Sequence, residues 1–163
     1  VMTLVAPSPP PLGTSMRIQV RTYEREQAHI KHTAIFGLIR TRRLARQADF
    51  DDALFVDADG KISEGTTWNI GLVRGDLVTW PQAPMLPGVT QALITQGLAE
   101  VGMRSETVPV SIDDLDRFDA AFLCNSATPA CPITAIGQHP FAPSRDIIAR
   151  VQAAWSAAVP QPV

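Results

Sequence analysis

Short apolar segments separated by turn residues fill the middle of the chain and restrict the folds open to it. Residues 53–56 and the run over 61–80 contain segments of strand length, and Arg74-Gly75-Asp76 has the composition of a hairpin tip. Apolar residues recur at helical spacing over residues 32–48 and 89–101. Because strands and helices do not alternate one for one, the pattern predicts an α+β domain rather than a regular βαβ series.

The two ends of the chain supply further elements of both kinds. Residues 16–23 alternate apolar and polar side chains, which is typical of a half-buried strand. Residues 120–124 form an apolar run short enough for a buried strand, and it ends at the polar Asn125-Ser126 turn. We further predict strands at 106–110 and 132–136, a short capped helix at 111–115 and a final helix at 144–158.

Proline dominates the segment before the first predicted strand. The prolines of residues 6–13 lack amide donors and bias the residues before them toward extended geometry, so this segment is not helical. We interpret residues 1–15 as an interdomain linker and residues 16–163 as one folded domain. Because the linker opens the chain and the first residue is not methionine, we expect the second half of a longer protein, without its upstream domain.

Composition and charge exclude several classes of protein. With 163 residues and 45% hydrophobic content, the chain can bury one substantial core. A formal charge of −2 gives no attraction to nucleic acid or to an anionic membrane, and no apolar stretch approaches a membrane span. Cys124 and Cys131 form neither a disulfide framework nor a zinc motif, so we expect buried thiols in a reducing cytoplasm. We interpret the one basic cluster as a solvated helix face: Arg40, Arg42, Arg43 and Arg46.

The chain contains only two lysines, and they lie in different settings. Lys31 lies between an extended segment and a predicted amphipathic helix, where a side chain can be fixed pointing inward. Lys61 follows the Asp59-Gly60 turn and is expected to be solvated. A lysine amine condenses with an aldehyde when it is neutral, and a protein interior beside a phosphate cofactor favours that state. Taken alone, Lys31 is better explained as an exposed charge at a helix start; the motifs after it favour a catalytic role.

Three motifs downstream of Lys31 have the chemistry of a cofactor site. Glu64 opens Glu64-Gly65-Thr66-Thr67-Trp68-Asn69 beside an apolar run, so its carboxylate is either exposed at a turn or held by a partner such as a pyridinium N–H. Leu86-Pro87-Gly88-Val89-Thr90 opens a helix, where the N–H groups of Val89 and Thr90 and the Thr90 hydroxyl can face a phosphate. Thr128, in Asn125-Ser126-Ala127-Thr128 at the mouth of a buried strand, is a second phosphate candidate. An ordinary helix start or turn is the alternative reading of the last two motifs. Pyridoxal phosphate is the one common cofactor that needs an amine, a carboxylate and a phosphate site together.

Other catalytic patterns are missing from the sequence. There is no GxSxG elbow, HExxH helix, Walker loop or GxGxxG fingerprint. The three histidines are scattered without the spacing of metal ligands, so we expect no metal: His29, His32 and His139. Helix capping and the helix dipole explain the acidic cluster of Asp113, Asp114 and Asp116.

The ordered motifs, from about Met16 to about Gly137, resemble the C-terminal domain of the class IV aminotransferases. These are the fold-type IV pyridoxal-phosphate enzymes, which include branched-chain and D-amino acid aminotransferases and aminodeoxychorismate lyase. The resemblance implies the D-amino acid aminotransferase-like fold, with mixed short strands in a pseudo-barrel and flanking helices. It also implies that Lys31 bonds to the cofactor and shuttles the proton, and that Glu64 pairs with the pyridine nitrogen. The phosphate would be bound by Val89, Thr90 and Thr128.

The resemblance implies transamination between an amino acid and a 2-oxo acid by a cytoplasmic homodimer. Branched-chain enzymes carry a tyrosine shortly after the lysine, where this chain has Phe36, which argues against branched-chain specificity. Lys31-His32 and Asn125-Ser126-Ala127-Thr128-Pro129 are more similar to the aminodeoxychorismate lyases, so a lyase is the alternative. A non-catalytic scaffold domain of the same fold is a third reading. Family members begin with a smaller domain that supplies a phosphate-binding arginine, and nothing in this chain corresponds to it.

Overall fold

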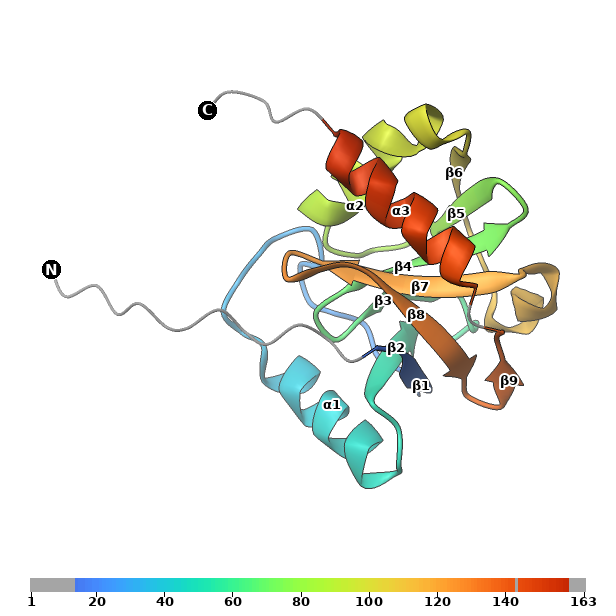
Figure 1. The fold of residues 1–163 in the computed structure, drawn as a ribbon. Coiled ribbons are helices and arrows are strands. Elements are labelled where there is room, and N and C mark those ends of the chain that lie inside the picture. Colours follow the sequence, from blue (N-terminus) through green and yellow to red (C-terminus); the bar gives the residue numbers. More distant parts are fainter. Residues whose placement is uncertain (1–13, 143, 159–163) are drawn as a thin grey trace, which may run out of the picture.

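Nine strands form one sheet in the part of the chain that the structure describes (Figure 1). The structure is a computed structural model and describes residues 14–142 and 144–158. Along the sheet the strand order is β3-β2-β1-β8-β7-β4-β5-β6, and β9 pairs with β8 off this path. The strands are β1 Met16–Thr22, β2 Asp52–Val56, β3 Ile62–Gly65, β4 Asn69–Arg74, β5 Leu77–Pro81, β6 Arg104–Val108, β7 Ala120–Asn125, β8 Thr128–Ile136 and β9 His139–Pro140.

Parallel and antiparallel pairs are mixed within this sheet. β1 is parallel to both of its neighbours, β2 and β8, although β8 lies far along the chain. β5 and β6 are also parallel, whereas β7 is antiparallel to β4 and to β8. The α+β prediction is therefore confirmed, and the hairpin predicted at Arg74-Gly75-Asp76 joins β4 to β5.

The strand order begins with β3 and ends with β6, and residues that follow β6 form hydrogen bonds with β3 and the residues before it. The backbone N–H of Ile62, in β3, donates to the Val110 carbonyl at 2.8 Å, and Ile112 N–H donates to the Gly60 carbonyl at 2.9 Å. Lys61 forms an antiparallel bridge with Ser111 between these two bonds. The sheet thus curls round to meet itself, as the predicted pseudo-barrel requires. Its main core contains Leu54, Ile62, Ile70, Leu72, Leu123 and Ile133.

Three α-helices flank the sheet within the described residues: α1 Phe36–Gln47, α2 Val89–Gly97 and α3 Arg145–Ala157. Figure 1 shows α2 and α3 side by side, with α1 separate from them beside β2. A Cβ built on Gly97 would lie 1.9 Å from the Ala154 carbonyl oxygen, so a glycine is needed where α2 meets α3. Two 3-10 helices, η1 Leu98–Val101 and η2 Ile112–Arg117, complete the fold.

One predicted helix boundary is wrong. Residues 32–35 are not helical, and α1 begins only at Phe36. His32 Nδ1 accepts a hydrogen bond from Ala34 N–H at 3.2 Å, and this local turn competes with helix formation. The helix predicted over 89–101 stops at Gly102 as expected, where φ is 68° and left-handed, and its last turn after Gly97 is the 3-10 helix η1.

The remaining predictions on domains and thiols have different outcomes. Residues 1–13 of the predicted linker lie outside the described residues, and so do residues 143 and 159–163. Both cysteines are buried, as expected, and burial raises the pKa of Cys124 to about 12 and that of Cys131 to about 11. None of the described helices is long and apolar enough to cross a membrane.

Candidate active site

Strand ends bring several of the sequence motifs to one edge of the sheet. Glu64 is the penultimate residue of β3, and Asn69 is the first residue of β4. Because β7 is antiparallel to β4, Asn69 lies opposite Cys124, and the Asn125 turn follows at the same edge. Gly88 lies against this edge as well, since a Cβ built on it would be 2.0 Å from Asn69 Oδ1.

Glu64 is a buried acid whose two carboxylate oxygens have different surroundings. Its side chain is 6% exposed. Oε2 accepts a hydrogen bond from the Leu86 backbone N–H at 3.2 Å. Oε1 lies 3.7 Å from Arg25 Nη1, yet it accepts no hydrogen bond from the described residues, which is unusual for a buried polar atom. Burial raises the pKa of Glu64, while the Leu86 N–H and the charges of Arg25 and Lys31 oppose that rise.

Both ends of the Glu64–Asn69 motif hold the same residue of the next loop. Glu64 accepts from the backbone N–H of Leu86, and Asn69 Nδ2 donates to the Leu86 carbonyl at 3.0 Å. Gly88 packs against the same Asn69 side chain, where a larger residue would clash. The Leu86 loop is therefore fixed from β3 and β4 immediately before α2 begins.

The first turn of α2 follows directly from this fixed loop. Gly88 is the N-cap residue, and because glycine has no side chain it makes no capping hydrogen bond to the first turn. Thr90 is buried, whereas the Val89 side chain is 72% exposed. Uncapped N–H groups at a helix start are available to an anion.

Lys31 lies in the loop between β1 and α1. It is exposed, and it is close enough to Glu64 for its charge to act on the pKa of that carboxyl. The loop around it is held by two bonds to carbonyls: Arg25 Nη2 donates to Ile30 O at 3.0 Å, and His32 Nε2 lies 2.9 Å from Glu26 O. Lys61 is exposed, as predicted, and lies in the bridge to Ser111.

Thr128 is the first residue of β8 and is buried. The backbone N–H groups of Ala127 and Thr128 donate to Asn125 Oδ1 at 3.0 and 2.9 Å, so the asparagine orders the turn. Thr128 also lines a cavity beside α3, together with Arg145 and Gln152. None of the other four predicted site residues lines that cavity. Hydrogen bonds thus link Glu64 to the loop that opens α2, Lys31 is linked to Glu64 through its charge alone, and Thr128 is linked less directly.

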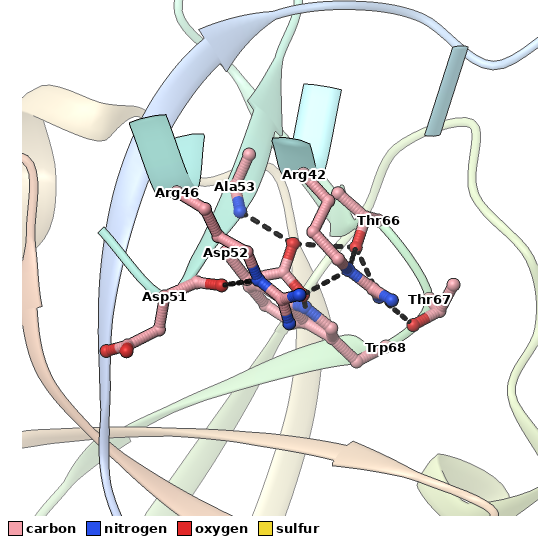
Figure 2. A network of polar contacts seen from close by, with 8 residues as sticks. All are labelled: Arg42, Arg46, Asp51, Asp52, Ala53, Thr66, Thr67 and Trp68. Atoms are coloured by element: carbon pink, nitrogen blue, oxygen red, sulfur yellow. Dashed lines mark hydrogen bonds and ion pairs between the residues drawn. The ribbon is translucent and has the colours of Figure 1, made fainter. Parts of the chain in front are cut away.

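Asp52 is a buried acid that contacts the Thr66-Thr67 turn, and it was not predicted from the sequence (Figure 2). Asp52, at the start of β2, is 1% exposed and accepts four hydrogen bonds. The donors are Arg42 Nε at 3.0 Å, Thr66 Oγ1 at 2.7 Å, Trp68 Nε1 at 3.1 Å and the Ala53 backbone N–H at 2.8 Å. Because the turn joins β3 to β4, this network sets the path between Glu64 and Asn69.

Two arginines of the site were not singled out from the sequence. The basic cluster was interpreted as a solvated face, which is wrong for Arg42, because its guanidinium pairs with Asp52 and also donates to Thr66 and Thr67. Its helical spacing from the buried Leu38, Thr41 and Ala45 could have indicated an inward position. Arg25 lies in a polar segment without periodicity, and no pattern there predicts that its side chain is only 7% exposed.

Comparisons with known proteins agree with this geometry. The family model described as amino-transferase class IV matches residues 1–136. Branched-chain-amino-acid aminotransferase 6 of Arabidopsis thaliana is 32% identical over 99 residues, which cover 58% of this chain and 28% of that protein. A probable branched-chain-amino-acid aminotransferase of Synechocystis is 24% identical over 151 residues, which cover 89% of this chain and 50% of that protein.

Solved structures share the fold. A fold IV-transaminase from Curtobacterium pusillum superposes with a TM-score of 0.78 and 25% identity, covering 87% of this chain and 52% of that one. A putative 4-amino-4-deoxychorismate lyase from Legionella pneumophila has a TM-score of 0.80 and 21% identity over 88% of this chain and 56% of its own. An aminotransferase from Brucella abortus bound to pyridoxal phosphate has a TM-score of 0.80 and 22% identity, covering 95% of this chain and 57% of that one. The chain spans about half the length of the solved relatives. By its family model and its fold, the chain belongs to the class IV aminotransferases.

Proposed function

We propose that this protein is a pyridoxal-phosphate-dependent aminotransferase that moves an amino group between an amino acid and a 2-oxo acid. The observation that carries the proposal is the buried Glu64, whose Oε1 accepts no hydrogen bond from residues 14–142 or 144–158 and which lies within electrostatic reach of Lys31. A buried acceptor next to a lysine is the pairing that a pyridine aldehyde requires.

The residues present fit this cofactor. A pyridinium N–H would supply the donor that Glu64 Oε1 lacks. The uncapped first turn of α2 would supply N–H groups to the phosphate, with the buried Thr90 beside them. Thr128 is proposed as a further phosphate ligand because its turn lies at the same edge of the sheet. When bound, pyridoxal phosphate supplies an aldehyde that condenses with amines and a protonated ring that stores the electrons of the broken Cα–H bond.

Residues of the chain would bind the cofactor, transfer the proton and hold the ring nitrogen and phosphate sites in place. Lys31 Nζ would hold the cofactor between turnovers and carry the proton removed from the substrate Cα. Glu64 would hold a proton on the ring nitrogen, because an ionised carboxylate beside that nitrogen favours its protonated form. The hydrogen bonds of Leu86 to Glu64 and Asn69 would keep the ring-nitrogen site and the phosphate site at a fixed separation.

Support for the substrate class comes from the relatives, which are named as branched-chain aminotransferases. Phe36 lies at the start of α1 and is 78% exposed, and it brings no hydroxyl to the cofactor. For this reason we propose a 2-oxo acid and amino acid pair without assigning a branched side chain. We also propose a homodimer in the cytoplasm, supported by the family resemblance and by a sequence with only two cysteines, both of them buried. Light scattering of the purified protein tests the dimer.

A half-reaction experiment tests the proposed activity. The protein is loaded with pyridoxal phosphate and mixed with a panel of amino acids, and both the 2-oxo acid and the aminated cofactor are measured by mass spectrometry. Stoichiometric formation of both products is expected for at least one amino acid. Release of pyruvate from aminodeoxychorismate without amination of the cofactor would favour the lyase instead. Cofactor binding without either reaction would favour the scaffold.

A further inference from the structure

Arg25 is a buried cation that the proposed chemistry does not yet use. Its side chain is 7% exposed, although it comes from a loop rather than from a strand or helix. An arginine this deeply buried needs anionic or carbonyl partners, because removing its charge from water is costly. Its partners are Glu64, at 3.7 Å, and the carbonyl of Ile30, at 3.0 Å.

These two partners belong to the two halves of the candidate site. Glu64 is the proposed partner of the ring nitrogen, and Ile30 directly precedes Lys31. One guanidinium therefore touches the carboxylate with Nη1 and the lysine loop with Nη2. The planar fork of arginine holds both contacts in a fixed relative orientation, which the single ammonium of a lysine does not do.

We propose that Arg25 is a positioning residue that keeps Glu64 ionised and aimed at a protonated ring nitrogen, and that fixes the backbone from which Lys31 reaches the cofactor. The inference rests on the proposed function and deepens it. It assigns a purpose to the 3.7 Å contact, in which the positive charge of Arg25 opposes the effect of burial on Glu64.

Two buried atoms that form no hydrogen bond with the described residues favour a positioning role for Arg25 over a purely structural ion pair. Arg25 Nε and Glu64 Oε1 are both buried and both lack a hydrogen-bond partner among the described residues. A structural pair of arginine and glutamate normally forms close, often paired hydrogen bonds. Here the contact is 3.7 Å long, so the charge is compensated while the hydrogen-bonding site on Oε1 stays open for a donor.

The loops that hold Glu64 from its two sides also face each other across a cleft. Arg25 contacts Oε1, and Leu86 contacts Oε2. The cleft is lined by residues of these same two loops, namely Arg25, Gln27, Ala28, His29, Ala83, Pro84 and Met85. A change at Arg25 would therefore act on the carboxylate and on this wall of the cleft together.

The test compares two cofactors in equilibrium binding: pyridoxal phosphate and its 1-deaza analogue, in which carbon replaces the ring nitrogen. Only the first uses Glu64, so the ratio of their dissociation constants reports the carboxylate alone. Arg25→Gln and Arg25→Met should reduce the preference for pyridoxal phosphate by roughly tenfold to a hundredfold, the worth of a hydrogen bond to a charged group. Arg25→Lys should keep most of the preference, because it keeps the charge.

Two controls make the result specific. Arg21→Met removes a half-buried arginine that bonds to the Gln19 side chain and should leave the ratio unchanged. In a Glu64→Gln background, Arg25→Gln should have no further effect on the ratio. Circular dichroism identifies the variants that fold. If both neutral variants unfold, Arg25→Lys is compared with Glu64→Gln, and a ratio in folded Arg25→Lys as low as that of Glu64→Gln would contradict the charge argument.

Two outcomes overturn the inference while leaving the proposed function intact. One is an unchanged ratio in a folded Arg25→Gln protein. The other is an equal loss of affinity for both cofactors, which indicates a general structural role. Failure of the unmodified protein to bind either cofactor overturns the proposed function as well, and so is distinguishable from both.

Discussion

Glu64 is an acid held inside the protein by one backbone N–H and one guanidinium. The sequence motif indicated that this carboxylate is either exposed at a turn or held by a partner, because it lies beside an apolar run, and the structure shows it held. The motif did not predict Arg25, since a side chain from an irregular loop has no periodicity that would place it inside. The partner of a buried charge is a tertiary contact and is visible only once the chain is folded.

The burial of Glu64 predicts a specific pH dependence of stability. Burial raises the pKa of Glu64 above its ordinary value of 4.5, so between 4.5 and the raised value the folded state binds more protons than the unfolded chain. The contribution of Glu64 to the free energy of unfolding should fall as the pH rises through this window, by at most about 1.4 kcal/mol per pH unit. Below pH 4.5 Glu64 is protonated in both the folded and the unfolded state, so its contribution to the unfolding free energy no longer changes with pH.

Urea denaturation of the cofactor-free protein from about pH 4 to about pH 7 checks this prediction. As the pH rises, the unfolding free energy of wild type should fall relative to that of Glu64→Gln. Glu64→Gln has no proton to bind at this position, so its own unfolding free energy should not carry this pH dependence. Glu100→Gln, at an exposed carboxyl in η1, should give a flat difference. A flat or rising difference for Glu64→Gln would contradict the assigned direction.

At the scale of elements, the sequence predicted most strands and the three α-helices, because their apolar periodicity is local. The sequence did not predict the hydrogen bonds that hold loops against strands. The contacts of Leu86 with Glu64 and Asn69 join residues distant in sequence, and no local pattern encodes them. The α1 boundary was also misplaced, because a side chain of the preceding turn competes with the helix.

The Leu86 loop can be tested by a double-mutant cycle on Gly88 and Asn69. Gly88→Ala places a Cβ 2.0 Å from Asn69 Oδ1, so it should displace the loop and weaken pyridoxal phosphate by roughly tenfold or more. Asn69→Ala removes both the obstacle and the bond to Leu86 O. The double variant should therefore bind no more weakly than Asn69→Ala alone. Additive losses would mean that the two residues act independently and that the clash is not the cause.

The Asp52 network predicts a stability effect rather than a direct effect on chemistry. Asp52→Asn keeps the shape of the side chain but removes the charge that pairs with Arg42 and one acceptor of the network (Figure 2). We expect the unfolding free energy to fall by about 1–3 kcal/mol, the range for charged and buried hydrogen bonds. Asp59→Asn, on an exposed turn, is the matched control. A loss at Asp52 below about 0.5 kcal/mol, within the usual range for surface substitutions, would show that the network contributes little.

At the scale of the whole molecule, the candidate site draws on segments from most of the described chain. The loop after β1 supplies Arg25 and Lys31, β3 supplies Glu64, and the start of α2 supplies Val89 and Thr90. The mixed sheet makes this possible, because strands distant in sequence are neighbours within it (Figure 1). The order of the motifs was sufficient to indicate a cofactor site. Their spatial linkage through Glu64, Leu86 and Arg25 required the folded structure.

The central claim is that this arrangement places Lys31, and not Lys61, at the cofactor aldehyde. Borohydride reduction of the protein loaded with pyridoxal phosphate makes the lysine–cofactor bond permanent, and peptide mapping by mass spectrometry then locates it. Lys61→Ala should retain the adduct and Lys31→Ala should lose it, because Lys61 lies in the bridge to Ser111. We expect one pyridoxyl group, on the peptide that contains Lys31; an adduct on Lys61, or no adduct on either lysine, would contradict the assignment of Lys31.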